Sequence, residues 1–265
     1  MTHKKIAIIG CGNLGAAILQ GLLDGSNVEP KNLIATKRNI QSLASFKAQG
    51  VVVTANNEEA VVRSEIILLG LKPHNTIAVL KELAPHLDGN KHVLVSLATG
   101  ITIAELTTVV GADIPIFRAM PNTAADVNES LTCLCANTAD DTTYGWVESL
   151  FLEIGKTQRI EEKLMEAATV LGACGIAYVL RFIRAMVQGG IQIGFDAETA
   201  SYIVNQTVKG ASQLLIQNGA HPEQEIDKVT TPKGCTIEGL NEMEHNGFSS
   251  ALIKGIVTSF EKIEK

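Results

Sequence analysis

The stretch that decides the fold is Lys4-Lys5-Ile6-Ala7-Ile8-Ile9-Gly10-Cys11-Gly12-Asn13-Leu14-Gly15. The uninterrupted apolar run over residues 6–9 predicts a strand buried on both faces, as in a parallel sheet. Glycines in the pattern Gly-x-Gly-x-x-Gly follow this run, and the apolar residues after Gly15 recur at helical spacing. A strand, a glycine turn and a helix in this order form the context that a dinucleotide-binding fingerprint requires.

Each glycine of this turn has its own physical role. Gly10 permits the tight turn, Gly12 lets the backbone approach a pyrophosphate, and Gly15 lets helix and strand pack closely. The pyrophosphate then lies on the free N–H groups at the helix N-terminus. We therefore expect a nicotinamide dinucleotide here; the alternative is a strand–helix turn that merely needs glycines.

The end of the expected second strand, residues 32–36, bears on the choice of cofactor. A cofactor with a free ribose 2′-hydroxyl usually meets an Asp or Glu about 20 residues beyond the glycines. This chain instead has Thr36-Lys37-Arg38-Asn39, with two cations and a hydroxyl but no acid. The pattern favours a 2′-phosphate and hence NADPH over NADH, although a solvated basic turn would have the same sequence.

Strands alternate with helical segments over about the first 155 residues, which predicts a doubly wound α/β sheet. Ligands of such sheets bind outside the carboxyl ends of the strands. Here those ends carry the glycine loop, Lys72-Pro73, residues 96–100 and residues 120–123. The further strands are expected at residues 51–53, 66–71, 92–97, 114–119 and 131–136, the last of which closes the sheet.

The second half of the chain reads as all-α. Its apolar faces exceed what a single layer of helices can bury, so they need cover from each other or from a second subunit. This surplus favours an obligate dimer. The small residues Gly172-Ala173-Cys174-Gly175 interrupt two helical segments. Helices are expected at residues 164–171, 177–187, 197–215, 237–243 and 249–263, with Asp196 as an N-cap, Gly219 as a C-terminal stop and Pro222 in a first turn.

The composition excludes several classes of partner. A net charge of −6 argues against nucleic acid and against an acidic membrane surface. The longest uncharged stretch of the apolar second half, residues 167–180, is shorter than the ~20 residues of a membrane span. No signal peptide is visible. Five cysteines, an odd number without metal-ligand spacing, indicate no metal site and a reducing, cytoplasmic setting.

A loop at residues 229–237 is the other unusual feature of the second half. Pro232 and Gly234 constrain it, and Thr236 stands at the start of a helix. Free N–H groups at Gly234, Cys235 and Thr236 could hold a carboxylate. Alternatively, Thr236 is only a helix cap.

Taken together, these motifs resemble the Δ1-pyrroline-5-carboxylate reductase family over essentially the whole chain. The resemblance rests on the glycine loop, Leu71-Lys72-Pro73, Ser96 to Gly100, Met120 to Thr123, Ala177-Tyr178 and Val229 to Ile237. It implies a Rossmann NADP-binding domain over residues 1–158 and a helical substrate-binding and dimerisation domain over residues 159–265. It also implies a homodimer that often assembles further, and reduction of pyrroline-5-carboxylate to L-proline by NAD(P)H, the last step of proline biosynthesis.

The resemblance also implies which residues bind the ligands. The substrate positions fall on Glu162, Cys235 and Thr236. The cofactor positions fall on Cys11, Asn13, Leu14, Lys37, Arg38, Asn57, Leu71, Lys72 and Ala98, alongside the three glycines of the loop and Pro73.

The chain departs from the family pattern at two loops. The family usually has Ser-Gly-Ser-Gly-Pro-Ala-Tyr where this chain has residues 172–178, Gly-Ala-Cys-Gly-Ile-Ala-Tyr. It usually has Ser-Pro-Gly-Gly-Thr-Thr where this chain has residues 231–236, Thr-Pro-Lys-Gly-Cys-Thr. Both loops flank the inferred substrate site. Lys233, the added cation, either strengthens binding of the substrate carboxylate or faces water.

Hydride transfer to an imine needs orientation, a carboxylate site and a protonated ring nitrogen rather than a nucleophile or a metal. We expect the N–H groups around Cys235 and Thr236 to hold the carboxylate and the Thr236 hydroxyl to contact the ring nitrogen. Glu162 could stabilise the iminium, or be a solvated glutamate at a helix start. The alternatives are a reductase of another cyclic imine or a hydroxyacid, and a catalytically silent nucleotide-binding protein.

Overall fold

The computed structural model describes residues 4–25, 28–138 and 140–263. They form two compact units, one reaching to Cys174 and the other spanning Gly175–Lys262. The expected division after residue 158 differs from this grouping. The reason is that the segment after residue 158 packs against the first unit as far as Cys174. Met165 is fully buried in the first unit's core, and the carboxylates of Glu162 and Glu166 pair with Arg118. The role assigned to each predicted domain stays a prediction.

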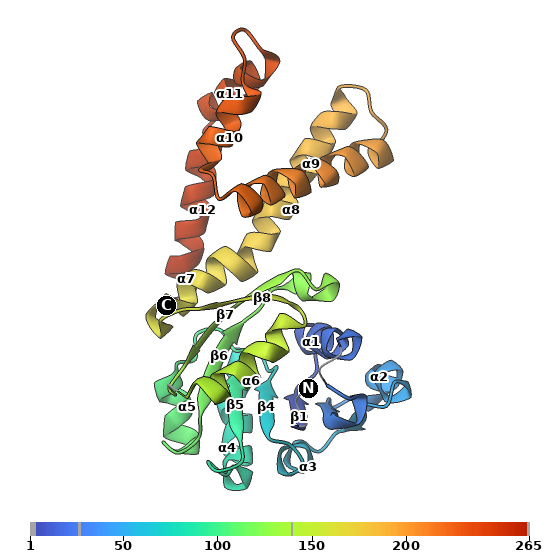
Figure 1. Cartoon of the computed structure of the whole chain (residues 1–265), viewed down its shortest axis with the longest axis vertical. Helices are drawn as coiled ribbons and strands as arrows, with labels where there is room; N and C mark the ends of the chain where they lie inside the picture. The colour runs from blue at the N-terminus through green and yellow to red at the C-terminus, as the bar shows by residue number, and fades with distance from the viewer. Residues whose placement is uncertain (1–3, 26–27, 139, 264–265) are drawn as a thin grey trace. The chain divides into compact units, whose positions relative to one another are not determined.

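The first unit is built on an eight-stranded sheet in the order β3-β2-β1-β4-β5-β6-β7-β8 (Figure 1). The strands from β1 to β6 run parallel, β7 is antiparallel to β6, and β8 is parallel to β7. The order reverses between β1 and β4, which places the expected ligand crevice at the carboxyl ends of these strands. The strands are β1 Ile6–Ile9, β2 Leu33–Thr36, β3 Val52–Thr54, β4 Ile66–Leu69, β5 Val93–Ser96, β6 Ile116–Met120, β7 Ser130–Ala136 and β8 Gly155–Arg159.

Successive side chains of each strand point to opposite faces of the sheet, and both faces are apolar. Ile6 and Ile8 of β1 pack with residues of α1 and α6, whereas Ala7 and Ile9 pack with residues of α3, α4 and α5. A strand buried on both sides in this way is what the apolar run after Lys5 predicts. The covering helices are α1 Asn13–Asp24, α2 Ala44–Ala48, α3 Asn57–Val62, α4 Pro73–Leu83, α5 Ile103–Val110 and α6 Asp141–Leu152.

The prediction that residues 131–136 close the sheet is wrong. Strand β8 adds one further strand beyond β7, and helix α6 lies between them in the sequence. The strand β8 reads Gly-Lys-Thr-Gln-Arg and is largely exposed, so it shows no apolar alternation. Charged residues on an edge strand oppose pairing with another chain, which explains why a genuine strand has this composition.

The second unit is helical and begins with α8 (Gly175–Gln192). This helix continues from the last elements of the first unit, helix α7 (Met165–Ala168) and the π-helical turn Thr169–Cys174. The expected interruption at residues 172–175 is therefore a widened turn inside continuous helix, in which the backbone hydrogen bonds span one residue more. The remaining helices are α9 Ala197–Asn218, α10 Pro222–Val229, α11 Cys235–His245 and α12 Phe248–Ile263.

The helix-end predictions in this unit are confirmed. The Asp196 side chain accepts a hydrogen bond from the N–H of Thr199, as an N-cap does. Gly219 ends α9 in the left-handed conformation with φ 61°, and Pro222 opens α10. These caps satisfy the backbone groups that a helix leaves unpaired at its ends.

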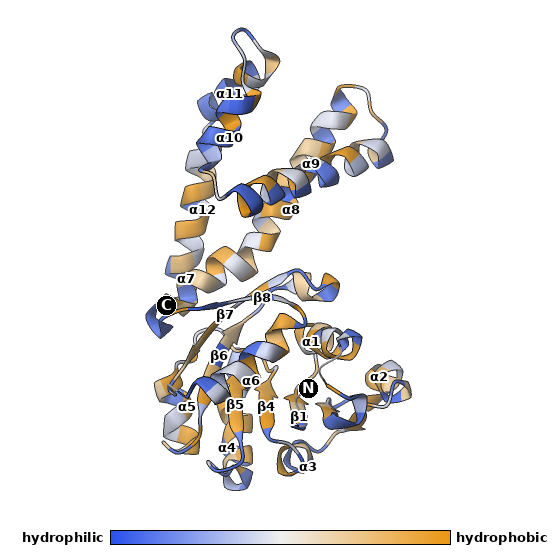
Figure 2. Cartoon of the chain, in the orientation of Figure 1, coloured by the Kyte–Doolittle hydropathy of each residue, from blue (hydrophilic) through white to orange (hydrophobic). Residues whose placement is uncertain are grey.

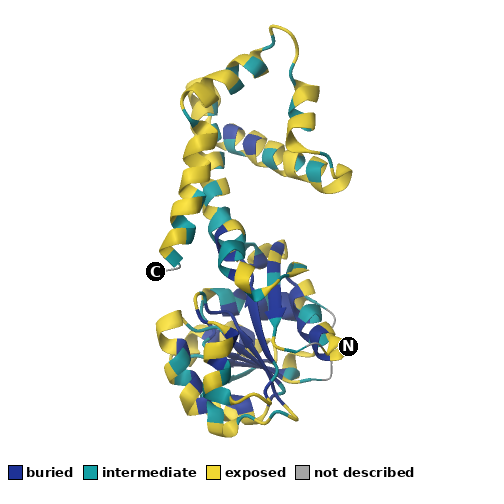
Figure 3. Ribbon diagram, turned by 90° about the vertical axis from the view of Figure 1, so that its left-hand side faces the viewer, coloured by how far each residue is buried: buried dark blue, intermediate teal, exposed yellow. Residues whose placement is uncertain are grey.

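Apolar surface is widespread on the helical unit. Its buried cluster is small, Val187, Ala200 and Val204. Figure 2 shows hydrophobic residues along α8 and α12, and Figure 3 shows the helical unit as mostly exposed or intermediate. Phe182, Leu180 and Leu252 are among the exposed residues. The helix over Glu162–Gln192 is long and apolar enough to cross a membrane by length and composition alone. The expectation from the sequence concerned uncharged residues, and the uncharged stretch 167–180 within this helix is shorter than a membrane span.

Candidate functional site

The glycine loop is held by the end of the neighbouring strand β2. The Thr36 hydroxyl accepts a hydrogen bond from the N–H of Gly10 (3.0 Å), and the Thr36 carbonyl accepts one from the N–H of Cys11 (2.7 Å). Gly10 has φ +80°, and a Cβ added there would lie 2.5 Å from Cδ2 of Leu71. Glycine is therefore favoured at this position by its backbone conformation, and a Cβ there would also displace the Leu71 side chain.

The N-terminus of α1 is suited to an anion. Gly12 is its N-cap and contributes no side-chain hydrogen bond, and its first turn carries no acidic residue. A Cβ added at Gly12 would meet no atom within 4 Å, so the backbone there borders open space. Unpaired N–H groups beside open space form the cradle that a pyrophosphate occupies in dinucleotide-binding folds. The residues present therefore fit the predicted cofactor.

The side chains of the loop contribute little to this cradle. Cys11 is fully buried, and burial raises the pKa of its thiol to about 11, with the charge of Lys37 acting in the opposite direction. Leu14 packs against the core, whereas Asn13 is exposed. If Cys11 and Leu14 contact a cofactor as predicted, they would do so through their backbone.

The turn after β2 carries two cations that are available to a ligand. Lys37 is half-buried and Arg38 is exposed. Within the described ranges, no ion pair engages either of them. Thr36 is buried against Gly10, and Asn39 uses its side chain to accept the N–H of Gln41. Lys37 and Arg38 are therefore the residues of this turn whose charge suits a phosphate.

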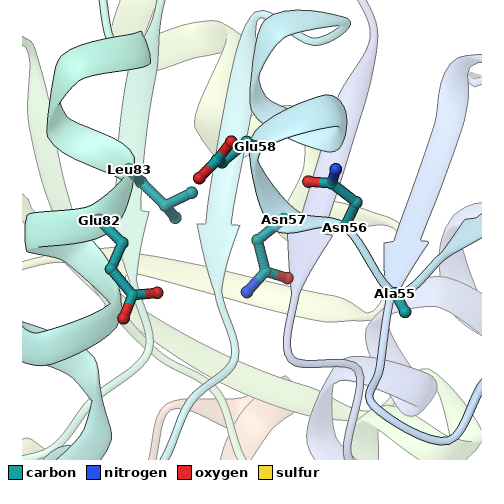
Figure 4. Close-up of a pocket in the computed structure, with 6 residues that line it drawn as sticks. All are labelled: Ala55, Asn56, Asn57, Glu58, Glu82 and Leu83. Atoms are coloured by element: carbon teal, nitrogen blue, oxygen red, sulfur yellow. The ribbon is translucent and has the colours of Figure 1, made fainter.

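A cavity of about 460 Å³ lies between the start of α3 and the end of α4 (Figure 4). One side of it is lined by Ala55, Asn56, Asn57 and Glu58, and the other by Glu82 and Leu83. Asn56 caps α3 by accepting the N–H of Glu59 (3.1 Å). Two carboxylates make this cavity unfavourable for a phosphate, so the predicted contact of Asn57 suits a neutral part of the cofactor.

The remaining predicted cofactor residues lie after β4 and β5. Leu71 packs against Gly10, Lys72 is the exposed N-cap of α4, and Pro73 is the first residue of that helix. Ala98 is buried and donates its N–H to the Ser96 hydroxyl at 3.3 Å. Because β1, β4 and β5 are adjacent and parallel, these residues share one edge of the sheet with the glycine loop.

Glu162 occupies an environment that neither sequence-based interpretation anticipates. Its Oε1 accepts the N–H of Ile103 at 2.6 Å and lies 3.3 Å from Nη1 of Arg118. Nη2 of Arg118 lies 2.5 Å from Oε1 of Glu166. Sequence reasoning missed Arg118 and Glu166; the available signal was a cation inside the apolar run Ile114-Pro115-Ile116-Phe117-Arg118.

In the helical unit, the predicted substrate loop is a tight turn that leads into α11. The N–H of Gly234 donates to the carbonyl of Thr231 at 2.9 Å, and Lys233 has φ 61°. Pro232 followed by a residue of positive φ is the arrangement of a type II turn, where glycine is preferred in place of Lys233. A Cβ on Gly234 would lie 2.6 Å from Oγ1 of Thr231 and 3.0 Å from its carbonyl oxygen, so a side chain there would displace Thr231.

The N-terminus of α11 leaves its N–H groups without a side-chain cap. Gly234 is the N-cap and makes no side-chain hydrogen bond, while Cys235 and Thr236 are the first two residues of the helix and are exposed. The alternative that Thr236 serves only as a helix cap is wrong. Within the described ranges its hydroxyl makes no hydrogen bond and the start of α11 has no side-chain cap, so these groups can meet a carboxylate.

Tyr178 of the motif Ala177-Tyr178 has a structural partner within the helical unit. Its hydroxyl lies 2.7 Å from the Ser259 hydroxyl, so it joins α8 to α12. Among the described residues, no group of three or more His, Cys, Asp or Glu could hold a metal ion.

Comparison with known proteins extends over the whole chain. A family model described as pyrroline-5-carboxylate reductase dimerisation matches residues 162–265, and one described as NADP oxidoreductase, coenzyme F420-dependent, matches residues 5–100. The structure is similar to the NADP-bound pyrroline carboxylate reductase of Plasmodium falciparum (TM-score 0.89, 28% identity, 99% of this chain and 98% of that one). It is equally similar to the pyrroline-5-carboxylate reductase of Coxiella burnetii (TM-score 0.90, 28% identity, the same coverage).

Curated relatives agree with these matches. The chain is 42% identical to pyrroline-5-carboxylate reductase 1 of Dictyostelium discoideum over 97% of its own length, and spans 49% of that protein. It is 39% identical to pyrroline-5-carboxylate reductase 2 of the same organism, covering 99% of this chain and 93% of the relative. It is 33% identical to the Escherichia coli enzyme, covering 99% and 98%. On this evidence the chain belongs to the pyrroline-5-carboxylate reductase family.

Proposed function

We propose that this chain reduces Δ1-pyrroline-5-carboxylate to L-proline with NADPH, the last step of proline biosynthesis. The observation that carries the proposal is the uncapped glycine cradle at the start of α1, in a chain that matches reductases of this family over nearly its whole length. The free N–H groups of α11 supply the second requirement, a site for the substrate carboxylate.

The preference for NADPH is supported by the turn after β2. Lys37 and Arg38 have no acidic partner within the described ranges, and the P. falciparum relative binds NADP. A phosphate paired with a guanidinium or ammonium gains charge-assisted hydrogen bonds that a ribose hydroxyl lacks. When bound, the cofactor supplies the hydride, and the loop residues Gly10 to Gly15 orient it through their backbone.

On the substrate side, the groups of α11 act as hydrogen-bond donors and acceptors. The N–H groups of Cys235 and Thr236, at the positive end of the helix dipole, would hold the substrate carboxylate. The Thr236 hydroxyl would contact the ring nitrogen, and Glu162 would favour its protonated form. A protonated imine accepts hydride far more readily than a neutral one, so an anion nearby lowers the barrier.

A homodimer accounts for the exposed apolar faces of the helical unit. Phe182, Leu180 and Leu252 are exposed in the single chain, and the family model that matches residues 162–265 is described as dimerisation. A second copy that covers these faces also explains the apolar helix Glu162–Gln192 without a membrane. Light scattering after gel filtration should give a dimer or a multiple of one, and vesicle flotation should leave the protein unbound; a vesicle-bound monomer would contradict this. A cytoplasmic location remains a prediction.

The role of Thr236 can be tested by a matched pair of variants. Thr236→Val removes the hydroxyl and keeps the shape, whereas Thr236→Ser keeps the hydroxyl. We expect Thr236→Val to lower kcat/KM for pyrroline-5-carboxylate by about tenfold or more, the loss of one hydrogen bond in the transition state. Thr236→Ser should stay within a few-fold of the parent, and the NADPH affinity of both should be unchanged. Full activity of Thr236→Val would contradict the assignment.

A further inference from the structure

A buried arginine occupies the middle of an otherwise apolar strand. The side chain of Arg118 is 3% exposed, and it extends from β6 toward two carboxylates that come from the chain after β8. Its Nη1 lies 3.3 Å from Oε1 of Glu162, and its Nη2 lies 2.5 Å from Oε1 of Glu166. Because these glutamates are 44 and 48 residues away in sequence, only the fold brings the three together.

The two oxygens of Glu162 differ in what they contact. Oε1 receives the N–H of Ile103 at 2.6 Å in addition to the guanidinium of Arg118. Oε2 has no hydrogen-bond partner in the described part of the chain, and the side chain is 35% exposed. One oxygen is therefore fixed from two directions while the other is open to a ligand.

The cluster is not arranged for stability alone. Nε of Arg118 and Oε2 of Glu166 are buried without a hydrogen-bond partner among the described residues. Unsatisfied buried polar atoms are costly, and a buried ion pair often stabilises a fold no better than apolar residues of the same size. A cluster with these costs at the start of the segment that leads to the substrate-binding helices calls for a functional explanation.

We propose that Arg118 is a positioning residue for the reaction and acts through Glu162. With the N–H of Ile103, its guanidinium holds Oε1, so that Oε2 is presented to the protonated ring nitrogen of the cyclic imine. A carboxylate fixed in advance stabilises the iminium without reorganising during hydride transfer. This inference rests on the proposed function, in which Glu162 contacts the substrate.

A double-mutant cycle tests whether Arg118 acts through Glu162. Glu162→Gln and Arg118→Met should each lower kcat for pyrroline-5-carboxylate reduction by about tenfold to a hundredfold, with the Kd for NADPH unchanged. The kcat of the double variant should lie within about twofold of that of the slower single variant. The reason is that either change alone already removes the contribution that the two residues make together. If the loss of kcat in the double variant equals the product of the two single-variant losses, the two residues act independently and the proposal is overturned.

Two further variants separate positioning from folding. Glu166→Gln breaks the other ion pair of Arg118, and it should lower Tm while kcat stays within about threefold of the parent. Arg118→Lys keeps the charge but loses the planar fork, and should give a kcat between those of the parent and Arg118→Met. If Glu166→Gln lowers kcat as much as Arg118→Met does, the cluster is only structural. If the parent chain does not reduce pyrroline-5-carboxylate at all, the proposed function is wrong, whatever the variants of Arg118 and Glu162 show.

Discussion

The hydroxyl of Thr36 accepts a hydrogen bond from the N–H of Gly10 at 3.0 Å, so the end of β2 fixes the first glycine of the cofactor loop. Thr36 is 1% exposed and its carbonyl also receives the N–H of Cys11. The second strand therefore shapes the pyrophosphate cradle before any cofactor binds.

Replacing Thr36 by valine should weaken both the fold and cofactor binding. Thr36→Val leaves the part-buried N–H of Gly10 without its partner, which costs about 1 kcal/mol of unfolding free energy. NADPH binding, measured by fluorescence titration, should weaken several-fold because the loop loses its support. Thr107→Val, which removes a hydroxyl bonded within α5, is the control and should leave the NADPH Kd unchanged. An unchanged NADPH Kd for Thr36→Val would show that the hydrogen bond between Thr36 and Gly10 does not contribute to cofactor binding.

Arg38 should determine the preference between the two cofactors. Arg38→Ala removes a cation that has no acidic partner in the described chain, so we expect the Kd for NADPH to rise about tenfold or more, and the Kd for NADH to change little. Lys47→Ala removes an exposed cation of α2 in the same unit and should change neither value. Equal weakening of NADPH and NADH by Arg38→Ala would show that it does not contact the 2′-phosphate.

Lys233→Gly should stabilise the helical unit. Lys233 has φ 61° at a turn position that prefers glycine, and removing the strain of a side chain there is worth about 1 kcal/mol. Chemical denaturation should show a higher free energy of unfolding for Lys233→Gly than for the parent. Lys233→Ala keeps the Cβ and should show no such increase. The KM for pyrroline-5-carboxylate should stay within about twofold if Lys233 faces water; a rise of about tenfold in both variants would show that its ammonium binds the substrate.

The buried thiol of Cys11 should make stability fall at alkaline pH. Burial raises the pKa of this thiol from 9.0 to about 11. Between these values the unfolded chain loses the proton and the folded chain keeps it, so unfolding is favoured as the pH rises. The free energy of unfolding should fall by up to about 1.4 kcal/mol per pH unit from this group.

Cys11→Ala isolates that contribution from other groups that titrate in the same range. The difference in unfolding free energy between the parent and Cys11→Ala should be constant below pH 9 and should shift against the parent between pH 9 and about 11. A difference that does not change with pH would show that Cys11 keeps its ordinary pKa in the folded protein.

The local sequence predicts two kinds of element: strands that are apolar throughout because they are buried, and turns or helix ends where the backbone conformation favours glycine. The strand Ile6–Ile9 and the glycine turn were predictable because a strand buried on both faces must be apolar throughout. The end of α9 was predictable because Gly219 takes a left-handed conformation that favours glycine. In each case the physical cause lies within a few residues of the element.

What the sequence could not predict depends on distant partners. The polar strand β8 forms only because β7 offers it an edge, and its own residues show no strand pattern. The pairing of Arg118 with Glu162 joins residues 44 positions apart, so no local pattern indicates it. The π-helical turn at Thr169–Cys174 reads as a break because Gly172 lies in it and Gly175 follows it, and glycine is a poor helix former.

The most direct test of the account is NADPH oxidation by the purified chain with pyrroline-5-carboxylate, followed by absorbance, with NADH in a parallel reaction and proline measured as the product. We predict turnover with one proline formed per NADPH consumed, and a lower KM for NADPH than for NADH. NADPH binding without turnover of pyrroline-5-carboxylate would contradict the central claim. In that case the cofactor site would stand, and the departures at Gly172 and Lys233 would become the first places to look for another substrate.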